Sequence, residues 1–361
     1  MKRKLRIIMT LALAFFLVAT VLLLYLWLSS YRPRPRETMA VRNAADSPHL
    51  QAGQSLKIMS WNIQFLAGKN YLFFFDILGD RGPDERPSSG DIARTLDEVV
   101  RVIWAENPDI LLLQEADVEA KRTDYQDQLA LISAKLPEFT SQTSCWYWKS
   151  GFVPHRRIKG AVGMKLAILS KYKISNALRY QLPQPPEGWL RRRFSLKRAI
   201  LQANLPLPDG RELAILNTHL EAFAQGSDTM QRQVEMVESL LEGLTREGKP
   251  WVIGGDFNLL PPGQAHSLLP GGQQAYFQPE TELRRLFDKF QAIPSQAEVN
   301  SADAARWFTH FPNDPAVKAP DRTIDYFFLS PHLEIGEHWV RQEDTMKISD
   351  HFPVILETKL P

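Results

Sequence analysis

The stretch Trp251-Val252-Ile253-Gly254-Gly255-Asp256-Phe257-Asn258 decides how this chain folds. Its first five residues form a short run typical of a buried strand, and an aspartate and an asparagine follow almost directly. Charged side chains are rarely buried unless they are paired or bind a metal. In open α/β sheets, ligands bind at the ends of strands. The stretch therefore predicts a strand that ends at a functional site.

Five other short motifs share this arrangement, with a polar group at the end of an apolar run. They are Ser60-Trp61-Asn62-Ile63-Gln64, Leu113-Gln114-Glu115, Asn217-Thr218-His219-Leu220, Thr323-Ile324-Asp325-Tyr326 and Ser349-Asp350-His351-Phe352-Pro353. Each motif alone is weak, because Asp-x-Asn is common in turns and Ser-Asp-His also suits a helix cap. One shared site at the strand ends explains all six.

Around these motifs, apolar runs alternate with helical periods from Ser55 onward. The runs predict strands at Leu56–Ile63, Ile110–Gln114, Met164–Leu169, Phe194–Ala203, Leu213–Leu220, Trp251–Gly255, Ile324–Leu329 and Val354–Thr358. Helices are expected over residues 92–103 with Asp91 as N-cap, and at Tyr125–Leu136, Met230–Leu244 and Thr281–Phe290. Strands that follow one another between residues 160 and 220 without helices indicate antiparallel hairpins, and hence mixed sheets.

The ordered series WN, QE, NTHL, GDFN, IDY and SDHFPV resembles the endonuclease/exonuclease/phosphatase superfamily over about residues 55–360. That superfamily includes DNase I-like nucleases, abasic-site endonucleases, inositol polyphosphate phosphatases and neutral sphingomyelinases. The resemblance implies an α/β fold, a four-layer sandwich in which two mixed β-sheets pack face to face with helices outside. The strand pattern agrees with this fold but does not give it by itself.

The expected metal ligands are Glu115, Asn62 and Asp350. Hydrolysis of a negatively charged phosphodiester requires that its charge be neutralised, that a water lose a proton and that the leaving oxygen be stabilised. The carboxylates of Glu115 and Asp350 and the amide oxygen of Asn62 are hard oxygen donors, which suit Mg²⁺ or Mn²⁺. Mg²⁺ keeps several waters, so few protein ligands are needed.

The resemblance implies catalytic roles for five residues. His351 contacts the phosphate or activates water, and Asp325 orients it, since a carboxylate partner fixes the imidazole tautomer and raises its pKa. Asp256 is the other candidate to position or deprotonate the attacking water. Asn258 donates to a phosphate oxygen, and His219 stabilises the transition state or protonates the leaving group.

One departure bears on the substrate. Gln64 stands two residues after Asn62, where abasic-site endonucleases have an aspartate, which counts against a repair nuclease. The histidines without a motif are assigned to surface or structure; they are His49, His155, His266, His310, His332 and His338.

The N-terminal segment predicts a membrane anchor. Residues Ile7–Leu28 form 22 residues without a charge, which as a helix span roughly 33 Å. A cleaved signal peptide has an apolar run of only about 7–15 residues, so we expect a retained, single-pass anchor. Lys and Arg before the span favour a cytoplasmic N-terminus and an extracytoplasmic catalytic domain, periplasmic in a bacterium.

These features predict that the chain has three parts. Residues 1–30 are a cytoplasmic stub and transmembrane anchor, residues 31–54 a Pro- and Arg-rich solvated linker, and residues 55–361 the catalytic domain. Of the 43 Lys and Arg residues, seven lie in residues 1–36, which leaves 36 in the rest of the chain against 41 Asp and Glu. This mildly acidic body is weak evidence against tight binding to a nucleic-acid backbone.

A few other stretches carry less information. Cys145 is the one cysteine, so an internal disulfide is excluded, and we expect a small buried side chain. Tyr71–Phe75 is either an ordinary buried element or an apolar wall near the site. Arg191–Arg193 beside Trp189 either hold phosphate groups or form a solvated loop. Arg322 either contacts phosphate or pairs with a carboxylate.

Three functions remain open. The first is a membrane-anchored, divalent-metal-dependent phosphoesterase that uses metal-assisted water attack on a phosphodiester or phosphomonoester, such as a phospholipid or sphingolipid head group or a small phosphoester. The second is a nuclease on extracytoplasmic DNA or RNA. The third is an inactive membrane-tethered binding module, which is disfavoured because no proposed catalytic position is replaced. The anchor and the acidic body favour the first. Nothing in the sequence indicates the oligomeric state.

Overall fold

The computed structural model describes residues 2–77, 79, 81–83, 85–222, 224 and 226–360. Its body is built from two groups of strands. One group comprises β2 (Val41–Asn43), β3 (Ser55–Asn62), β4 (Ile110–Asp117), β5 (Ser141–Val153), β6 (Gly160–Ser170), β13 (Glu334–Val340) and β14 (Val354–Lys359). The other comprises β1 (Arg36–Met39), β7 (Asn176–Gln181), β8 (Ala199–Pro206), β9 (Glu212–His219), β10 (Trp251–Asp256), β11 (Gln291–Ile293) and β12 (Asp325–Leu329).

The helices are mostly short. They are α1 (Lys2–Ser29), α2 (Ser89–Glu106), α3 (Gln128–Lys135), α4 (Trp189–Phe194), α5 (Thr229–Arg246), α6 (Ala265–Leu268), α7 (Gly271–Gln274), α8 (Arg284–Phe287) and α9 (Gln296–Val299). Four 3₁₀ turns within the described residues accompany them, namely η1 (Gln64–Leu66), η2 (Phe74–Asp76), η3 (Lys121–Thr123) and η4 (Ala304–Trp307).

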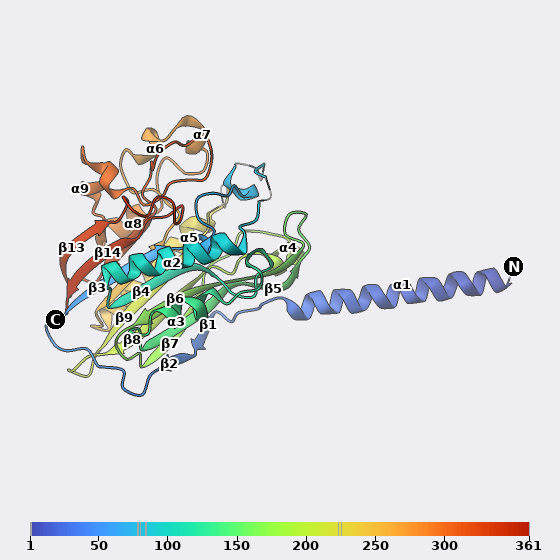
Figure 1. Cartoon of the computed structure of the whole chain (residues 1–361), viewed down its shortest axis with the longest axis horizontal. Helices are drawn as coiled ribbons and strands as arrows, with labels where there is room; N and C mark the ends of the chain where they lie inside the picture. Colours follow the sequence, from blue (N-terminus) through green and yellow to red (C-terminus); the bar gives the residue numbers. More distant parts are fainter. Residues whose placement is uncertain are drawn as a thin grey trace.

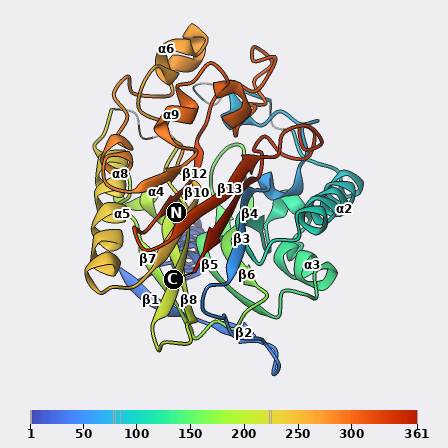
Figure 2. The same ribbon diagram turned by 90° about the vertical axis from the view of Figure 1, so that its left-hand side faces the viewer.

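In the described part of the chain, the strands form two seven-stranded sheets that face each other (Figure 1). The strand orders are β13-β14-β3-β4-β6-β5-β2 and β1-β7-β8-β9-β10-β12-β11. Helices α2 and α3 cover the outer face of the first sheet, and α5 and α8 cover that of the second (Figure 2). This confirms the predicted sandwich of two mixed sheets with helices outside.

Side-chain alternation explains the layers. In β3, Leu56 and Ile58 join the core between the sheets, while Met59 and Trp61 pack outward under α2, as the period of two in a strand requires. Helix α2 places apolar side chains at helical spacing along one face and buries that face. Its N-cap is Ser88, whose Oγ accepts the backbone N–H of Asp91 at 3.1 Å, so the prediction of Asp91 as the cap is wrong.

The structure corrects other boundaries. The single strand predicted at Phe194–Ala203 is instead the end of α4, a short connection and the start of β8. The helices predicted at Tyr125–Leu136 and Thr281–Phe290 are shorter, because only α3 and α8 have helical hydrogen bonding there. Strands β5, β7 and β13 were not predicted.

The predicted linker is partly structured. Strand β1 pairs antiparallel with β7, and β2 pairs antiparallel with β5, so this segment passes from the edge of one sheet to the edge of the other. Each short strand thereby covers backbone groups that an open edge would leave unpaired. The prediction of a solvated tether is therefore wrong for residues 36–43, while the boundary between anchor and catalytic domain stays a prediction.

Helix α1 projects away from the body (Figure 1). An 18-residue window of it has a mean hydropathy of 2.9, and none of that window is buried. The helix is long and apolar enough to cross a membrane, although a signal sequence near the N-terminus meets the same test.

Candidate active site

Four of the predicted residues lie at the ends of two parallel strand pairs. β3 runs parallel to β4 in one sheet, and β9 runs parallel to β10 in the other. The carboxyl ends of parallel neighbours share one edge, which brings Asn62 beside Glu115 and His219 beside Asp256. The two pairs meet across the sandwich, because the Asn62 amide nitrogen donates to Asp256 Oδ2 at 3.1 Å and to Glu115 Oε1 at 3.3 Å.

The buried Asp256 carboxylate is the centre of this group. Its Oδ2 lies 3.2 Å from His219 Nε2 and 3.6 Å from His351 Nε2. Asp325, which pairs with Asp256 in the β10–β12 register, holds the other side of His351 through a 2.8 Å hydrogen bond from Nδ1 to Oδ2. The structure therefore places His351 between two aspartates, and the expected contact of Asp325 with His351 is present.

The buried charges shift the pKa values of these groups in different directions. Burial alone would lower the pKa of His351, but Asp325 and Asp256 raise it to about 10. Burial raises the pKa of Asp256 to about 7, although His351 opposes the rise. Burial, together with the positive charges of Arg198 and His351, lowers the pKa of His219. The site thus holds one cationic and one neutral histidine around a shared carboxylate.

The oxygen donors expected to bind a metal lie at the same edge. Burial raises the pKa of Glu115, and the negative charge of Asp350 raises it further. Among the described residues, no Lys or Arg forms an ion pair with Glu115. The carboxylates of Glu115 and Asp350 repel each other, and a divalent cation would remove that repulsion. The donor set therefore fits a hard divalent metal.

Asn62 is oriented differently from a simple ligand. Its Oδ1 accepts the backbone N–H of Gln64 at 3.0 Å, so its NH₂ group faces Asp256 and Glu115. In this arrangement its NH₂ group positions both carboxylates, while its oxygen keeps a second lone pair beside the bond to Gln64. Gln64 also accepts the backbone N–H of Asp350 at 3.3 Å, which ties the ends of two motifs together.

The turn at Gly254-Gly255-Asp256-Phe257-Asn258 requires a glycine at position 255. A Cβ on Gly255, whose φ is +147°, would lie 2.0 Å from the Thr218 carbonyl oxygen of the neighbouring strand, so no other residue fits. After it, Asp256 Oδ1 accepts the backbone N–H of Asn258 at 2.9 Å. Asn258 has a φ of +51° and donates its amide to Leu220 O at 3.2 Å, which places it at the rim of the site.

Two residues of the site were missed or misplaced by sequence reasoning. His310, which was assigned to surface or structure, lies with Nε2 3.8 Å from Asp350 Oδ2 and its ring 4.5 Å from that of His351. Its backbone bridges to His351, so the chain topology brings it there and no local motif marks it. The other five histidines without a motif lie outside this cluster.

Arg198 was not singled out at all. It is 5% exposed, and its Nε and Nη1 have no hydrogen-bond partner in the described part of the chain. Nε lies 3.9 Å from Glu221 Oε1. Residues just before Ile200 lie beside His219, because Ile200 pairs with Thr218. The available signal in the sequence is Lys197-Arg198, which stands directly before the apolar run of β8. β8 lies beside β9, the strand that ends in Asn217-Thr218-His219.

The remaining predictions have plain outcomes. Arg322 pairs with Asp321, with Nε 2.6 Å from Oδ1, and not with Asp325. Cys145 is buried, as expected. The aromatic rings of Tyr71, Phe73 and Phe75 pack with Phe65 in a small cluster next to the turn that follows Asn62.

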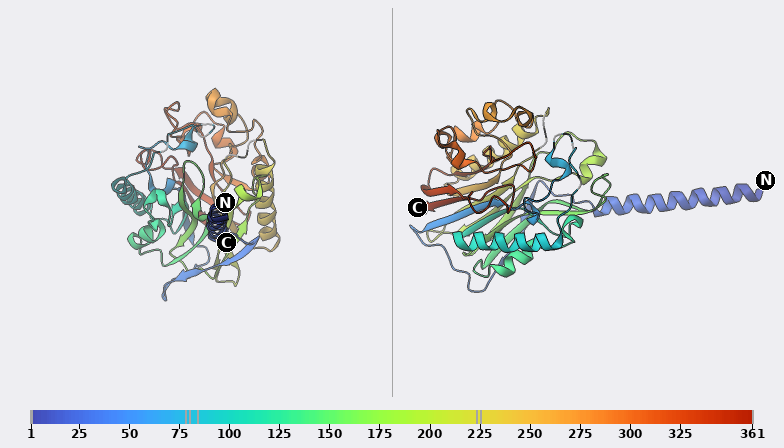
Figure 3. Two further views of the ribbon diagram at one scale, coloured as in Figure 1. Left: turned by 90° about the vertical axis from the view of Figure 1, so that its right-hand side faces the viewer. Right: turned by 45° about the horizontal axis from the view of Figure 1, so that its top comes forward.

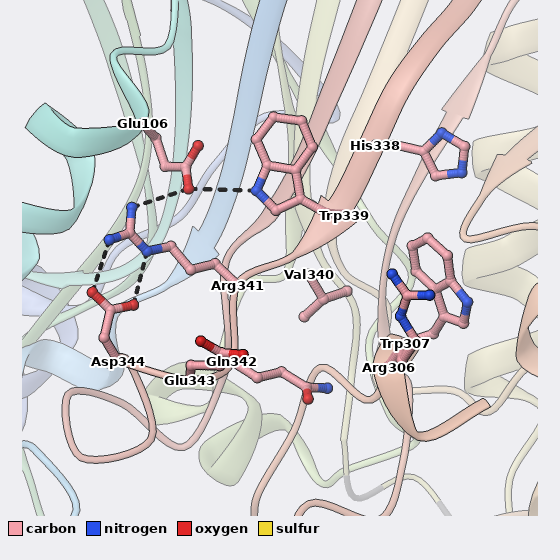
Figure 4. Close-up of a pocket in the computed structure, with 10 residues that line it drawn as sticks. All are labelled: Glu106, Arg306, Trp307, His338, Trp339, Val340, Arg341, Gln342, Glu343 and Asp344. Atoms are coloured by element: carbon pink, nitrogen blue, oxygen red, sulfur yellow. Dashed lines mark hydrogen bonds and ion pairs between the residues drawn. The ribbon is translucent and has the colours of Figure 1, made fainter. Parts of the chain in front are cut away.

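A pocket of about 480 Å³ lies elsewhere (Figure 4). It is lined by Glu106, Arg306, Trp307, His338, Trp339, Val340, Arg341, Gln342, Glu343 and Asp344. Three of its charged groups pair with one another, since Arg341 lies 3.0 Å from Glu106 and 2.7 Å from Asp344. None of the predicted site residues lines it, so this pocket does not define the active site.

Comparison with known proteins identifies the family and agrees with the fold. A model of the Endonuclease/Exonuclease/phosphatase family matches residues 59–351. The endonuclease/exonuclease/phosphatase from Beutenbergia cavernae superposes with a TM-score of 0.56 and 21% identity, over 85% of this chain and 72% of that chain. The human Nocturnin catalytic domain with bound sulfate anion superposes with a TM-score of 0.52 and 18% identity, over 89% and 96%. At these identities the likeness concerns the fold.

Two curated proteins match parts of the sequence. Inositol phosphosphingolipids phospholipase C of Schizosaccharomyces pombe is 30% identical over 116 residues, which is 30% of this chain and 27% of that protein. UPF0294 protein VP2298 of Vibrio parahaemolyticus is 27% identical over 164 residues, or 42% and 54%. The matches thus span about a quarter and about half of these relatives.

Proposed function

The chain belongs to the endonuclease/exonuclease/phosphatase family, and from this premise we propose that it hydrolyses a phosphodiester by metal-assisted attack of water. Members of this family are hydrolases of phosphoester bonds. The observation that carries the proposal is the convergence of Glu115, Asp350, Asp256, Asp325 and His351 at one edge of the sandwich.

The metal belongs at the two carboxylates of Glu115 and Asp350, with Asn62 beside them. When bound, Mg²⁺ or Mn²⁺ offsets the negative charge of the phosphate and of the leaving oxygen. Glu115 is the central ligand, because it is half-buried, lies next to Asp350 and lacks an ion pair with Lys or Arg among the described residues. The two hydrogen bonds from the Asn62 amide give it the further task of positioning the carboxylates of Glu115 and Asp256.

The remaining polar residues divide the chemistry. Asp256 accepts the proton of the attacking water. Its carboxylate lies between two imidazoles and forms no ion pair with a Lys or Arg among the described residues. His351, fixed by Asp325, presents Nε2 to the phosphate.

Three further residues complete the division of roles. His219 lies on the opposite side of Asp256 from Asp325 and serves the leaving group or the transition state. Asn258 donates to a phosphate oxygen from the rim. Arg198, a buried cation with unpartnered N–H groups, adds a second positive contact to the substrate.

We favour a phosphodiester of a lipid head group as the substrate. The relative named inositol phosphosphingolipids phospholipase C supports this class, as does the apolar helix α1. We propose that α1 is retained as a single-pass anchor, with the catalytic domain outside the cytoplasm. A nuclease is the second candidate, because the family includes nucleases by name.

The test uses the full-length protein in detergent micelles with Mg²⁺. Its three substrates are the soluble diester bis(p-nitrophenyl) phosphate, a phospholipid and plasmid DNA, and Asp256→Ala is the matched inactive control. We expect release of the lipid head group and of p-nitrophenol, and neither with the variant. Cleavage of plasmid DNA alone would replace the lipid proposal with the nuclease, and no turnover of any substrate would refute the function.

A further inference from the structure

Helix α1 leaves the body at the same edge that carries the catalytic residues. Strand β5 is antiparallel to β6, and β6 is antiparallel to β4, so β5 runs in the same direction as β4. It therefore ends at the same edge as β4, which carries Glu115 near its end. The end of β5 also holds the end of α1, through a bridge between Ser30 and Ser150 and a 3.2 Å hydrogen bond from Tyr31 N to Lys149 O. Figures 1 and 3 show α1 leaving on the side of β5 and α4, opposite the C-terminus.

The anchor and the site are close together along β5. The ring of Tyr147 lies 5.6 Å from the ring of His219, and Ser150 follows three residues later on the same strand. Because a strand rises about 3.3 Å per residue, the two points are roughly 10 Å apart along it. A membrane entered by α1 would therefore lie beside the catalytic centre.

Exposed apolar side chains gather where α1 meets the body. Phe152 is 37% exposed, Trp189 69% and Leu190 53%. Helix α4, which carries Trp189 and Leu190, touches the last turn of α1, since the Arg193 guanidinium lies 3.5 Å from the centre of the Trp27 ring. Single exposed apolar residues are ordinary on protein surfaces, but these lie together beside the end of an apolar helix.

The same place is positively charged. Arg191, Arg192 and Arg193 follow Trp189 and Leu190 directly. The nearby acidic groups are already paired, as Glu187 lies 2.9 Å from Arg191 and Glu119 lies 3.5 Å from Lys149. Arg192 and Arg193 have no such carboxylate partner among the described residues. Aromatic side chains together with arginines are the combination that binds the head-group layer of anionic membranes.

We propose that Phe152, Trp189, Leu190 and Arg191–Arg193, here called the anchor-side surface, rest on the head groups of the anionic bilayer that α1 enters. This contact holds the catalytic centre toward phosphoesters of that same bilayer. The proposal rests on the proposed function for its substrate, but the contact itself is independent of catalysis. It assigns a role to the aromatic and arginine residues that the sequence left open.

The first experiment locates the surface without using activity. The full-length chain is reconstituted into vesicles of phosphatidylcholine and phosphatidylglycerol, and Leu190→Cys is labelled with a nitroxide. Cys145 is buried and burial raises the pKa of its thiol to about 12, so it reacts poorly. Leu268→Cys on α6, where Leu268 is 71% exposed, is the matched control.

We expect the label at position 190 to be shielded from a water-soluble nickel chelate and relaxed by oxygen, as in a bilayer, and the label at 268 to show the reverse. Equal exposure of both labels to the nickel chelate would overturn the proposed contact, whether or not the protein is an enzyme.

The second experiment measures the consequence for catalysis. The double variant Trp189→Ser, Leu190→Ser is compared with Trp104→Ser, Leu268→Ser, in which the replaced residues are 66% and 71% exposed. We expect the first variant to lose about tenfold or more of its rate on vesicle lipid, because it loses interfacial side chains, while its rate on bis(p-nitrophenyl) phosphate is kept.

The control pair should keep both rates. Unchanged hydrolysis of vesicle lipid by the Trp189, Leu190 variant would overturn the orienting role. Absence of hydrolysis of every substrate by the wild-type protein would instead refute the proposed function and leave the labelling result standing.

Discussion

Arg198 gives the sharpest test of the site, because its loss should affect activity and stability differently. Its guanidinium is 5% exposed, and two of its nitrogens have no hydrogen-bond partner in the described structure. A buried charge without full hydrogen bonding is costly for a fold. If that cost serves substrate binding, then Arg198→Met removes an interaction with the phosphate and keeps most of the side-chain volume.

The expected loss of activity follows from the lost contact. A hydrogen bond to a charged group contributes about 1.5–3 kcal/mol, and each 1.36 kcal/mol corresponds to about tenfold in rate. One lost contact between Arg198 and a phosphate oxygen should therefore lower kcat/KM by roughly 10- to 150-fold. The assay is the initial rate on bis(p-nitrophenyl) phosphate at saturating Mg²⁺, read across substrate concentration.

The expected effect on stability depends on Glu221. Its carboxylate is also buried and lies 3.9 Å from Arg198 Nε, too far for a hydrogen bond. Arg198→Met alone leaves Glu221 as an uncompensated buried charge, which should lower Tm. Arg198→Met with Glu221→Gln removes both charges, and such replacements of buried pairs are often neutral or stabilising. We therefore expect the double variant to regain Tm and not activity.

The result that would refute this reasoning is a double variant that regains both Tm and kcat/KM. Arg198 would then be a structural partner of Glu221 with no contact to the substrate. A folded Arg198→Met variant with wild-type kcat/KM would lead to the same conclusion.

Four other predictions concern the metal, the catalytic unit and the anchor. EDTA should abolish turnover, and Mg²⁺ or Mn²⁺ should restore it. Glu115→Gln should raise the metal concentration that gives half-maximal rate. Full activity in EDTA would exclude this mechanism. We expect about a 10²-fold or greater loss of kcat, with unchanged circular dichroism, for each of the variants Asp256→Ala, His351→Ala and His219→Ala. The double variant of Asp256 and His351 should lose less kcat than the product of the two single-variant losses. Asp325→Asn should lower the pKa of His351 from about 10, because it removes the anion bound to Nδ1; an unchanged pKa by NMR would contradict the pairing. Intact mass of the membrane fraction should include α1, and a mature chain beginning after that helix would disprove a retained anchor.

The strands that end at the site could be predicted because they are buried on both faces. β4 and β10 read as continuous apolar runs that stop at a charged residue, which is a strong local signal. β5 lacks this signal, because most of its residues alternate between buried and half-exposed and include four aromatic residues with serines and a lysine. β1 and β2 lie at sheet edges in a Pro- and Arg-rich segment, where composition favours a linker and only the partner strands stabilise the extended backbone.

The convergence of the motif residues at one edge could be predicted from the sequence, whereas the residues that topology brings to that edge could not. Asp256 and His351 stand in stretches whose neighbours reveal them. Arg198 and His310 stand in stretches without such neighbours. Arg198 reaches the site because β8 lies antiparallel beside β9, and His310 reaches it through a backbone bridge to His351. Both facts depend on pairings between distant parts of the chain, which a local pattern does not contain.

The motif residues that are not catalytic have a structural task that explains why they are polar. Gln114, which precedes Glu115, donates its amide to Asn217 Oδ1 at 2.7 Å, and both side chains are fully buried. Asn217 in turn donates to the backbone oxygens of Leu113 at 2.9 Å and Ala167 at 2.8 Å. Gln114 belongs to one sheet and Asn217 to the other, so these bonds join the two sheets directly beneath the site.

Apolar side chains hold two sheets together without fixing how one slides over the other, whereas buried hydrogen bonds are directional and costly to break. Each sheet contributes one parallel pair in an otherwise antiparallel arrangement, β3 with β4 and β9 with β10. The bonds of Gln114 and Asn217 align these two pairs. The side chains of Glu115, His219 and Asp256 are therefore held relative to one another by the sheets themselves, which is the preorganisation that the proposed hydrolysis of a charged phosphodiester requires.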